Sequence, residues 1–132
     1  MPVYIDTSAI YAILDETDIS HEAAAATWHL MDDRSESLFT SNYVLLETVA
    51  LLQGRLGLES VRVLETRVVP LLTIRWVDRD LHTRATGALL TAGRRNLSLV
   101  DCVSFEVMRE MDLDTAFVFD AHFTEQGFRL AS

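Results

Sequence analysis

The sequence predicts an α/β domain, a three-layer sandwich in which helices cover both faces of a parallel β-sheet. Short β-rich runs alternate with amphipathic helices along the chain, which is the pattern of parallel sheets. Apolar residues make up 49% of the sequence, which argues against disorder. No repeat, linker or low-complexity tract divides the 132 residues, so residues 1–132 are expected to form one domain.

The first forty residues contain two expected strands and two expected helices. The strands are 3–5 and 38–40, and the helices are 9–14 and 21–31. The first strand stops at Asp6. Thr7 and Ser8 come next, and their hydroxyls are expected to cap the first helix.

A long amphipathic helix is expected over residues 43–56. Its apolar side chains follow the spacing of 3.6 residues per turn, at Val44, Leu45, Val49, Leu52 and Leu56. Ser41 is the expected N-cap and Gly57 the expected end of this helix. Another amphipathic helix is expected over residues 59–69, before Pro70.

The alternation continues through the second half of the chain. We expect strands at 74–77, 115–119 and 127–130, helices at 79–92 and 98–111, and a basic turn at 93–96. The helix at 79–92 begins at Asp78 or Arg79, and the next one begins at Ser98. The run at 115–119 is continuously apolar and ends at Asp120, as expected of a buried parallel strand.

The composition limits the classes of protein that fit. Twenty acidic residues against eleven basic ones give a net charge of −9, an unfavourable balance for binding a polyanion. All eleven basic residues are arginine. The single cysteine, Cys102, favours a reducing compartment. Because the sequence also lacks a secretory signal and an apolar run long enough to span a bilayer, we expect a cytoplasmic protein without membrane contact.

Four acidic residues are expected at one edge of the sheet. Asp6 and Asp120 each follow a strand directly, Asp101 lies in the first turn of the helix that Ser98 begins, and Glu47 lies one turn inside the helix at 43–56. Sites in open parallel sheets form at the carboxyl ends of the strands, where these four residues converge.

A divalent cation would explain such a cluster. Like charges raise each other's pKa, so several carboxylates are stable together when a cation neutralises them. All-oxygen sites favour Mg²⁺ or Mn²⁺ over zinc, and no Cys/His spacing in the sequence resembles a zinc site. Mg²⁺ held by carboxylates is a common catalytic cofactor for phosphodiester hydrolysis.

Structural roles are the alternative for each acid. Asp6 and Asp120 could cap the helices that follow them, and Asp101 forms a capping-box pattern with Ser98. Glu47 differs, because its neighbours are almost all apolar and a buried acid needs a partner. We therefore interpret Glu47 as a buried charge, and one metal site accounts for all four acids.

Four motifs resemble those of PIN-domain ribonucleases, in the order and spacing of that family. They are residues 3–9 (VYIDTSA), 40–47 (TSNYVLLE), 97–102 (LSLVDC) and 117–123 (FVFDAHF). The nearest subgroup is the VapC-like toxins of toxin–antitoxin pairs, which are single domains of about this length. One position departs from the pattern: many relatives have Thr or Ser where this chain has Val118.

The resemblance implies a five-stranded parallel sheet in the order 3-2-1-4-5 and a metal-dependent endoribonuclease. Asp6, Glu47, Asp101 and Asp120 would hold Mg²⁺ or Mn²⁺, with the Thr7 or Ser8 hydroxyl in support. The partners it implies are RNA and a cognate antitoxin. A homodimer is a second hypothesis, because the two helices spanning 43–69 present more apolar side chains than one small sheet can cover.

Some residues and functions remain open at this stage. Arg94 and Arg95 are candidates for phosphate contact, with a solvated basic loop as the alternative. His21, His29, Trp28, Trp76 and His122 are interpreted as packing or surface residues. A housekeeping RNA-processing nuclease and a catalytically silent binding module are alternative functions. A phosphatase with Asp6 as nucleophile fits less well, because position 8 is serine and lysine is absent.

Overall fold

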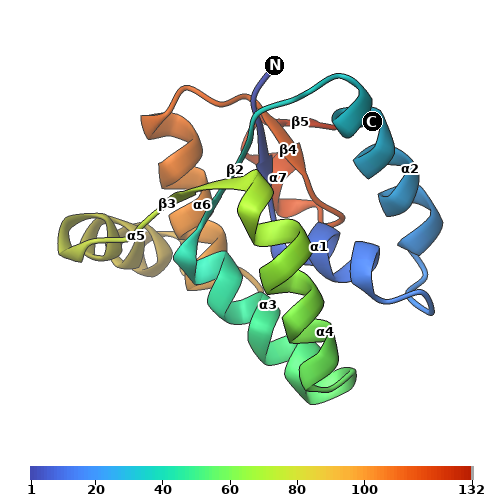
Figure 1. Ribbon diagram of the computed structural model, residues 1–132. Helices are drawn as coiled ribbons and strands as arrows, with labels where there is room; N and C mark the ends of the chain where they lie inside the picture. Colours follow the sequence, from blue (N-terminus) through green and yellow to red (C-terminus); the bar gives the residue numbers. More distant parts are fainter. Residues whose placement is uncertain (132) are drawn as a thin grey trace.

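A computed structural model, describing residues 1–131, confirms the parallel α/β sandwich (Figure 1). Its five strands are β1 (Val3–Ile5), β2 (Leu38–Ser41), β3 (Leu72–Arg75), β4 (Thr115–Phe117) and β5 (Arg129–Leu130). They lie in the order β3-β2-β1-β4-β5, and every neighbouring pair is parallel. The strand order implied by the four motifs is therefore correct.

Helices flank this sheet on two sides. They are α1 (Thr7–Leu14), α2 (His21–Asp33), α3 (Asn42–Arg55), α4 (Leu58–Val63), α5 (Arg79–Ala92), α6 (Leu99–Glu110) and α7 (His122–Glu125). In Figure 1, α5 and α6 lie on one side of the sheet and α1 and α2 on the other, while α3 and α4 run side by side. No helix in the part of the chain that the structure describes is both long and apolar enough to cross a membrane.

Side-chain caps begin most of the long helices. The Ser41 hydroxyl accepts a hydrogen bond from Val44 N, as the sequence predicts. Asp78 accepts one from Leu81 N and is the N-cap of α5, which begins at Arg79, one of the two expected starts. The prediction for α1 is wrong: its N-cap is Asp6, whose carboxylate accepts from Ser8 N. Asp6 is the last extended residue before α1, which is the N-cap position, so its side chain can bond the free N–H groups of the first helical turn. Thr7 and Ser8 already lie inside the helix.

Three strands differ from their expected ranges, and beyond the ends of two of them a side chain bonds the backbone in place of a neighbouring strand. β4 ends at Phe117, and Phe119 N donates instead to the Ser8 hydroxyl. β3 covers Leu72–Arg75 where 74–77 was expected, and Val77 N donates to the side chain of Asn42. β5 is only Arg129–Leu130, shorter than the expected 127–130.

The helix expected over 59–69 is divided into three pieces. After α4 the chain forms a π-helical turn (Leu64–Val68) and then a 3-10 turn (Val69–Leu71). Pro70 has no N–H to donate four residues back, so the regular α-helix cannot continue through it.

The structural roles expected for Trp28 and His21 are confirmed, whereas the core position expected for Trp76 is wrong. Trp28 packs partly buried against the core, and His21 Nδ1 lies 2.7 Å from the Ala12 carbonyl oxygen, so both are structural as expected. Trp76, expected in the core, is 65% exposed because β3 ends one residue earlier and the chain turns away from the sheet.

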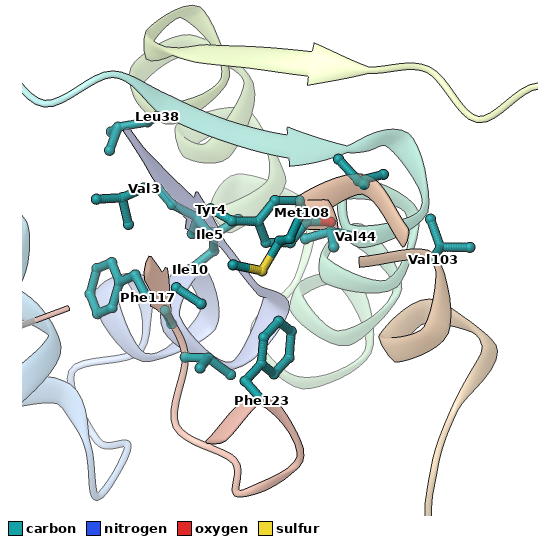
Figure 2. Close-up of a cluster of buried hydrophobic side chains, with 14 of the residues drawn as sticks. Val3, Tyr4, Ile5, Ile10, Leu38, Val44, Val103, Met108, Phe117 and Phe123 are labelled. Carbon is teal, nitrogen blue, oxygen red and sulfur yellow. The ribbon is translucent and has the colours of Figure 1, made fainter. Parts of the chain in front are cut away.

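The core is centred on β1, whose three residues are all buried (Figure 2). Tyr4 and Ile5 are inaccessible to solvent and pack among Phe117, Met108 and Phe123. The Tyr4 hydroxyl lies 2.8 Å from the Ser104 hydroxyl of α6, which satisfies both buried groups. Since β1 is the central strand, this packing fixes the position of Asp6 at its end.

We expect Tyr4→Phe to lower the free energy of unfolding by about 1–2 kcal/mol, because the buried Ser104 hydroxyl loses its partner. Urea unfolding followed by circular dichroism measures the change. Tyr43→Phe, which removes an exposed hydroxyl, is the control and should have less effect. Equal stability of Tyr4→Phe and the wild-type protein would contradict the packing described here.

Candidate active site at the carboxyl edge of the sheet

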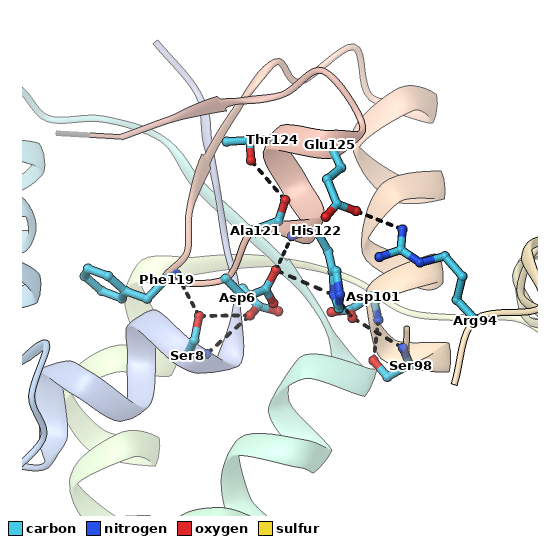
Figure 3. A network of polar contacts seen from close by, with 11 residues as sticks. Asp6, Ser8, Arg94, Ser98, Asp101, Phe119, Ala121, His122, Thr124 and Glu125 are labelled. Carbon is cyan, nitrogen blue, oxygen red and sulfur yellow. Dashed lines mark hydrogen bonds and ion pairs between the residues drawn. The ribbon is translucent and has the colours of Figure 1, made fainter. Parts of the chain in front are cut away.

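The four acids singled out by the sequence all line one cleft, of about 460 Å³. Asp6 lies at the end of β1, Glu47 on α3, Asp101 in the first turn of α6, and Asp120 beyond β4. Thr7 and Ser8 also line the cleft. Figure 3 shows the end of β1 facing the start of α6 and the loop before α7. The topology thus brings four distant segments together, as the rule for parallel sheets predicts.

Asp6 is the most buried of the four, with 4% of its surface exposed. Its Oδ2 accepts hydrogen bonds from the Ser8 N–H at 3.3 Å and the Ser8 hydroxyl at 3.1 Å. Its Oδ1 is buried and has no hydrogen-bond partner among the described residues. Burial, followed by the charge of Asp101, raises the pKa of Asp6 to about 7. Without a cation, this carboxylate is therefore costly to ionise.

Asp101 has a structural and an electrostatic role at once. Ser98 and Asp101 form the reciprocal capping box that the sequence offered as an alternative, with Asp101 N donating to Ser98 Oγ at 3.0 Å. The Asp101 side chain returns a bond through Oδ2, which accepts from Ser98 N at 3.3 Å. Its charge is also the largest electrostatic influence on Asp6. The capping role consequently holds Asp101 in the cleft and does not exclude a metal role.

His122 joins Asp101 and Asp120, contrary to its interpretation as a packing or surface residue. Its ring Nδ1 lies 3.1 Å from Asp101 Oδ2, and its backbone N–H donates to Asp120 Oδ1 at 2.7 Å. The three residues each offer a ligand atom, and these atoms lie within 4.8 Å of one another. Burial raises the pKa of Asp120, while the His122 N–H partly offsets this. The sequence signal for this role of His122 was its spacing of two residues from Asp120, because the turn after β4 brings these two side chains together.

Glu47 is partly exposed, so its interpretation as a buried charge is wrong. The side chains of α3 that are fully buried are Val44, Thr48 and Leu52, on a neighbouring stripe of the helix. The apolar neighbours of Glu47 do not indicate burial, because some of them are exposed themselves; Leu46 has 70% of its surface exposed. Glu47 still faces the cleft, and its charge contributes to the raised pKa of Asp6.

The hydroxyls of Thr7 and Ser8 have different partners. Thr7 Oγ1 donates to the Val44 carbonyl at 3.3 Å and accepts from Thr48 Oγ1 at 3.2 Å, so it joins α1 to α3. Ser8 Oγ donates to Asp6 Oδ2 and accepts from Phe119 N at 3.0 Å, so it joins the end of β1 to the segment beyond β4. Of the two, Ser8 is the one in contact with an acid of the cleft.

The arginines near the cleft differ from those that the sequence indicated. Arg94 pairs with Glu125 at 2.8 Å, and neither Arg94 nor Arg95 lines the cleft (Figure 3). Arg55, at the end of α3, does line it and was missed. The signal was its spacing: Glu47, Leu51 and Arg55 recur every four residues, and all three face the cleft.

The residues present fit a hard divalent cation. The donor set is four carboxylates with one imidazole beside them, and carboxylate oxygens are the ligands that Mg²⁺ and Mn²⁺ prefer. The buried Oδ1 of Asp6 has no hydrogen-bond partner among the described residues, so it is open to coordinate a cation.

Comparison with known proteins identifies the family to which this fold belongs. The sequence matches the PIN domain over residues 3–129, nearly the whole chain. The chain belongs to the PIN-domain family. This PIN domain is 32% identical over 127 residues to the 23S rRNA-specific endonuclease VapC20 of Mycobacterium tuberculosis, in strains CDC 1551 / Oshkosh and H37Rv alike. The matched region covers 96% of this chain and 95% of VapC20.

A solved structure agrees with the sequence comparison. The crystal structure of M. tuberculosis VapC20, described as a sarcin–ricin-loop-cleaving toxin, matches this PIN domain with a TM-score of 0.83. The identity is again 32%, over 96% of this chain and 95% of that one. The resemblance drawn from the four motifs, including the VapC-like subgroup, is confirmed.

Proposed function

We propose that this PIN domain is an endoribonuclease that depends on Mg²⁺ or Mn²⁺ and acts as the toxin of a toxin–antitoxin pair. The observation that carries the proposal is the buried carboxylate of Asp6, with one oxygen unpartnered and the other three predicted acids, Glu47, Asp101 and Asp120, on the same cleft. Its relative VapC20 is a 23S rRNA-specific endonuclease of similar length and fold. Both lines of evidence support hydrolysis of RNA.

The chain's own residues position the reacting groups. Asp6, Asp101 and Asp120, with Glu47 at the open side, would hold the cation. A bound divalent cation would supply an acidified water and neutralise charge on the phosphate. His122 orients both Asp101 and Asp120, and Ser8 holds Asp6 in register with the segment beyond β4. Rigid orientation of the acids matters because small displacements at a ligand lower the affinity and activity of a metal site.

The substrate and partners follow from the same relatives. A ribosomal RNA loop, as for VapC20, is the first substrate to test, and a target in ribosomal RNA would place the activity in the cytoplasm. An antitoxin and a second copy of the chain are the proposed protein partners. In support, several large apolar side chains around α3, α4 and β3 are exposed, namely Leu46, Leu56, Leu58, Leu71 and Trp76.

We expect the purified protein to cleave ribosomal RNA or a sarcin–ricin-loop hairpin with Mg²⁺ or Mn²⁺ and to lose this activity in EDTA. Gel analysis of a 5′-labelled RNA panel measures the effect. Restoring the cation after chelation should restore cleavage at the same positions. Cleavage that persists undiminished in EDTA would contradict the proposal, as would inactivity of the antitoxin-free protein on the whole panel.

A further inference from the structure

Arg55 differs from the other arginines near acidic side chains. It is the one arginine, within residues 1–131, that lines the acidic cleft. Arg62, Arg75, Arg84 and Arg94 are each paired with an Asp or Glu carboxylate. Arg55 has no carboxylate within 4.0 Å in the same described part of the chain, and its side chain is exposed. Its guanidinium is therefore accessible to a ligand and is not neutralised by a direct carboxylate partner.

An aromatic ring fixes the position of this guanidinium. The Arg55 Cζ lies over the Tyr11 ring, 5.2 Å from its centroid. Tyr11 is itself held firmly, because it is 6% exposed and its hydroxyl donates to Asp15 Oδ2 at 2.5 Å. Asp15 is fixed in turn by two hydrogen bonds from Thr17. This cation–π contact holds the Arg55 guanidinium beside the cleft, where its side chain is exposed.

The position along α3 separates Arg55 from the acids. Glu47 and Arg55 are eight residues apart on the helix, which corresponds to roughly 12 Å along its axis. A phosphate at the four acids and a phosphate at Arg55 would therefore belong to different nucleotides. A guanidinium that is not paired with a carboxylate matches a phosphate group, because it has five N–H donors and a fixed positive charge.

We propose that Arg55, which lies over the Tyr11 ring beside the cleft, binds a backbone phosphate of the RNA away from the bond that is cleaved. The inference rests on the proposed ribonuclease function and names a binding contact within the same site. Arg55 is a positioning residue: it aligns the strand along α3 so that the scissile phosphate lies at the acids. In a chain of net charge −9, one free cation at the cleft gives the polyanion a defined orientation.

The test compares Arg55→Ala with Arg62→Ala, which removes the same charge from an exposed helix outside the cleft. For cleavage of a sarcin–ricin-loop hairpin, we expect Arg55→Ala to raise KM about tenfold and to leave kcat within about threefold, the loss of one charge-assisted contact. The slope of log affinity against log salt should fall by about 0.7–0.9, as for one lost phosphate contact. Arg62→Ala should change neither, and Arg55→Lys should recover part of the affinity.

The outcomes separate this inference from the proposed function. Wild-type cleavage with unchanged KM and salt slope in Arg55→Ala would overturn the role of Arg55 and leave the nuclease intact. Equal losses in Arg55→Ala and Arg62→Ala would also overturn it, because the effect would then be that of net charge alone. A wild-type protein that neither binds nor cleaves the RNA panel would overturn both.

Discussion

Asp101→Asn is expected to reduce RNA cleavage by at least about a hundredfold while the protein stays folded. The substitution removes the charge of a proposed metal ligand, and a cation at such a site contributes several kcal/mol to stabilising the transition state. The amide oxygen of Asn can still accept the bond from Ser98 N that Asp101 Oδ2 accepts now. Single-turnover cleavage of the hairpin RNA, with unfolding curves for both proteins, measures the two effects separately.

Ser98→Ala is the matched control for this prediction. It removes the capping hydroxyl that accepts from Asp101 N but leaves the carboxylate in place. It should therefore destabilise the fold by about 1 kcal/mol and retain most of the activity. If Ser98→Ala were as inactive as Asp101→Asn, the acid would matter as a cap and not as a ligand.

Asp6→Asn is expected to stabilise the metal-free protein at pH 8. The pKa of Asp6 is about 7 in the folded protein against a usual value of 3.8, so the folded state binds the proton more tightly. The contribution of Asp6 to the free energy of unfolding is fully present below about pH 4, and it is lost as the carboxyl ionises when the pH rises through 7. Replacing the carboxylate with a neutral amide should recover roughly 2–4 kcal/mol at pH 8, and much less at pH 4.

Added Mg²⁺ should reduce or remove the stability advantage of Asp6→Asn. A cation that binds only the folded state stabilises it by about 2.7 kcal/mol at a hundred times its dissociation constant, and Asp6→Asn should lose most of that gain. Thermal unfolding in EDTA and in excess Mg²⁺, between pH 4 and pH 8, tests both parts. Asp33→Asn, at an exposed position, controls for net charge. A wild-type melting temperature independent of both pH and Mg²⁺ would contradict the assignment of Asp6.

The sequence predicts those features that depend on short stretches of chain. The helix at 43–56, its Ser41 cap and the capping box of Ser98 and Asp101 are all set by neighbouring residues, and the structure has them. The convergence of the four acids could also be anticipated, because strand ends in a parallel sheet share one edge. Confirmation of the family adds the strand order, which spacing alone does not determine.

What the sequence cannot supply depends on contacts between distant segments. The end of β4 is set by the Ser8 hydroxyl, 111 residues away in sequence, and no local pattern signals this. The burial of Glu47 was misjudged because an apolar neighbour on a helix can face solvent as well as core. The spacing of Arg55 from Glu47 places both on one face of α3, but the contact of Arg55 with Tyr11 is seen only in the structure. Each of these requires the packed arrangement of α1, α3 and the sheet.

The double role of Asp6 and Asp101, as helix caps and as acids of the cleft, bears on how such a domain evolves. At both positions Asn serves as a cap nearly as well as Asp, and at Asp6 it also relieves a buried charge. In the metal-free protein, an Asp→Asn substitution that removes the proposed activity would therefore meet no opposition from folding, and selection for activity would be what retains the acids. A silent binding protein is thus a single substitution away from the nuclease, and any copy of this domain released from that selection would reach it without passing through an unstable intermediate.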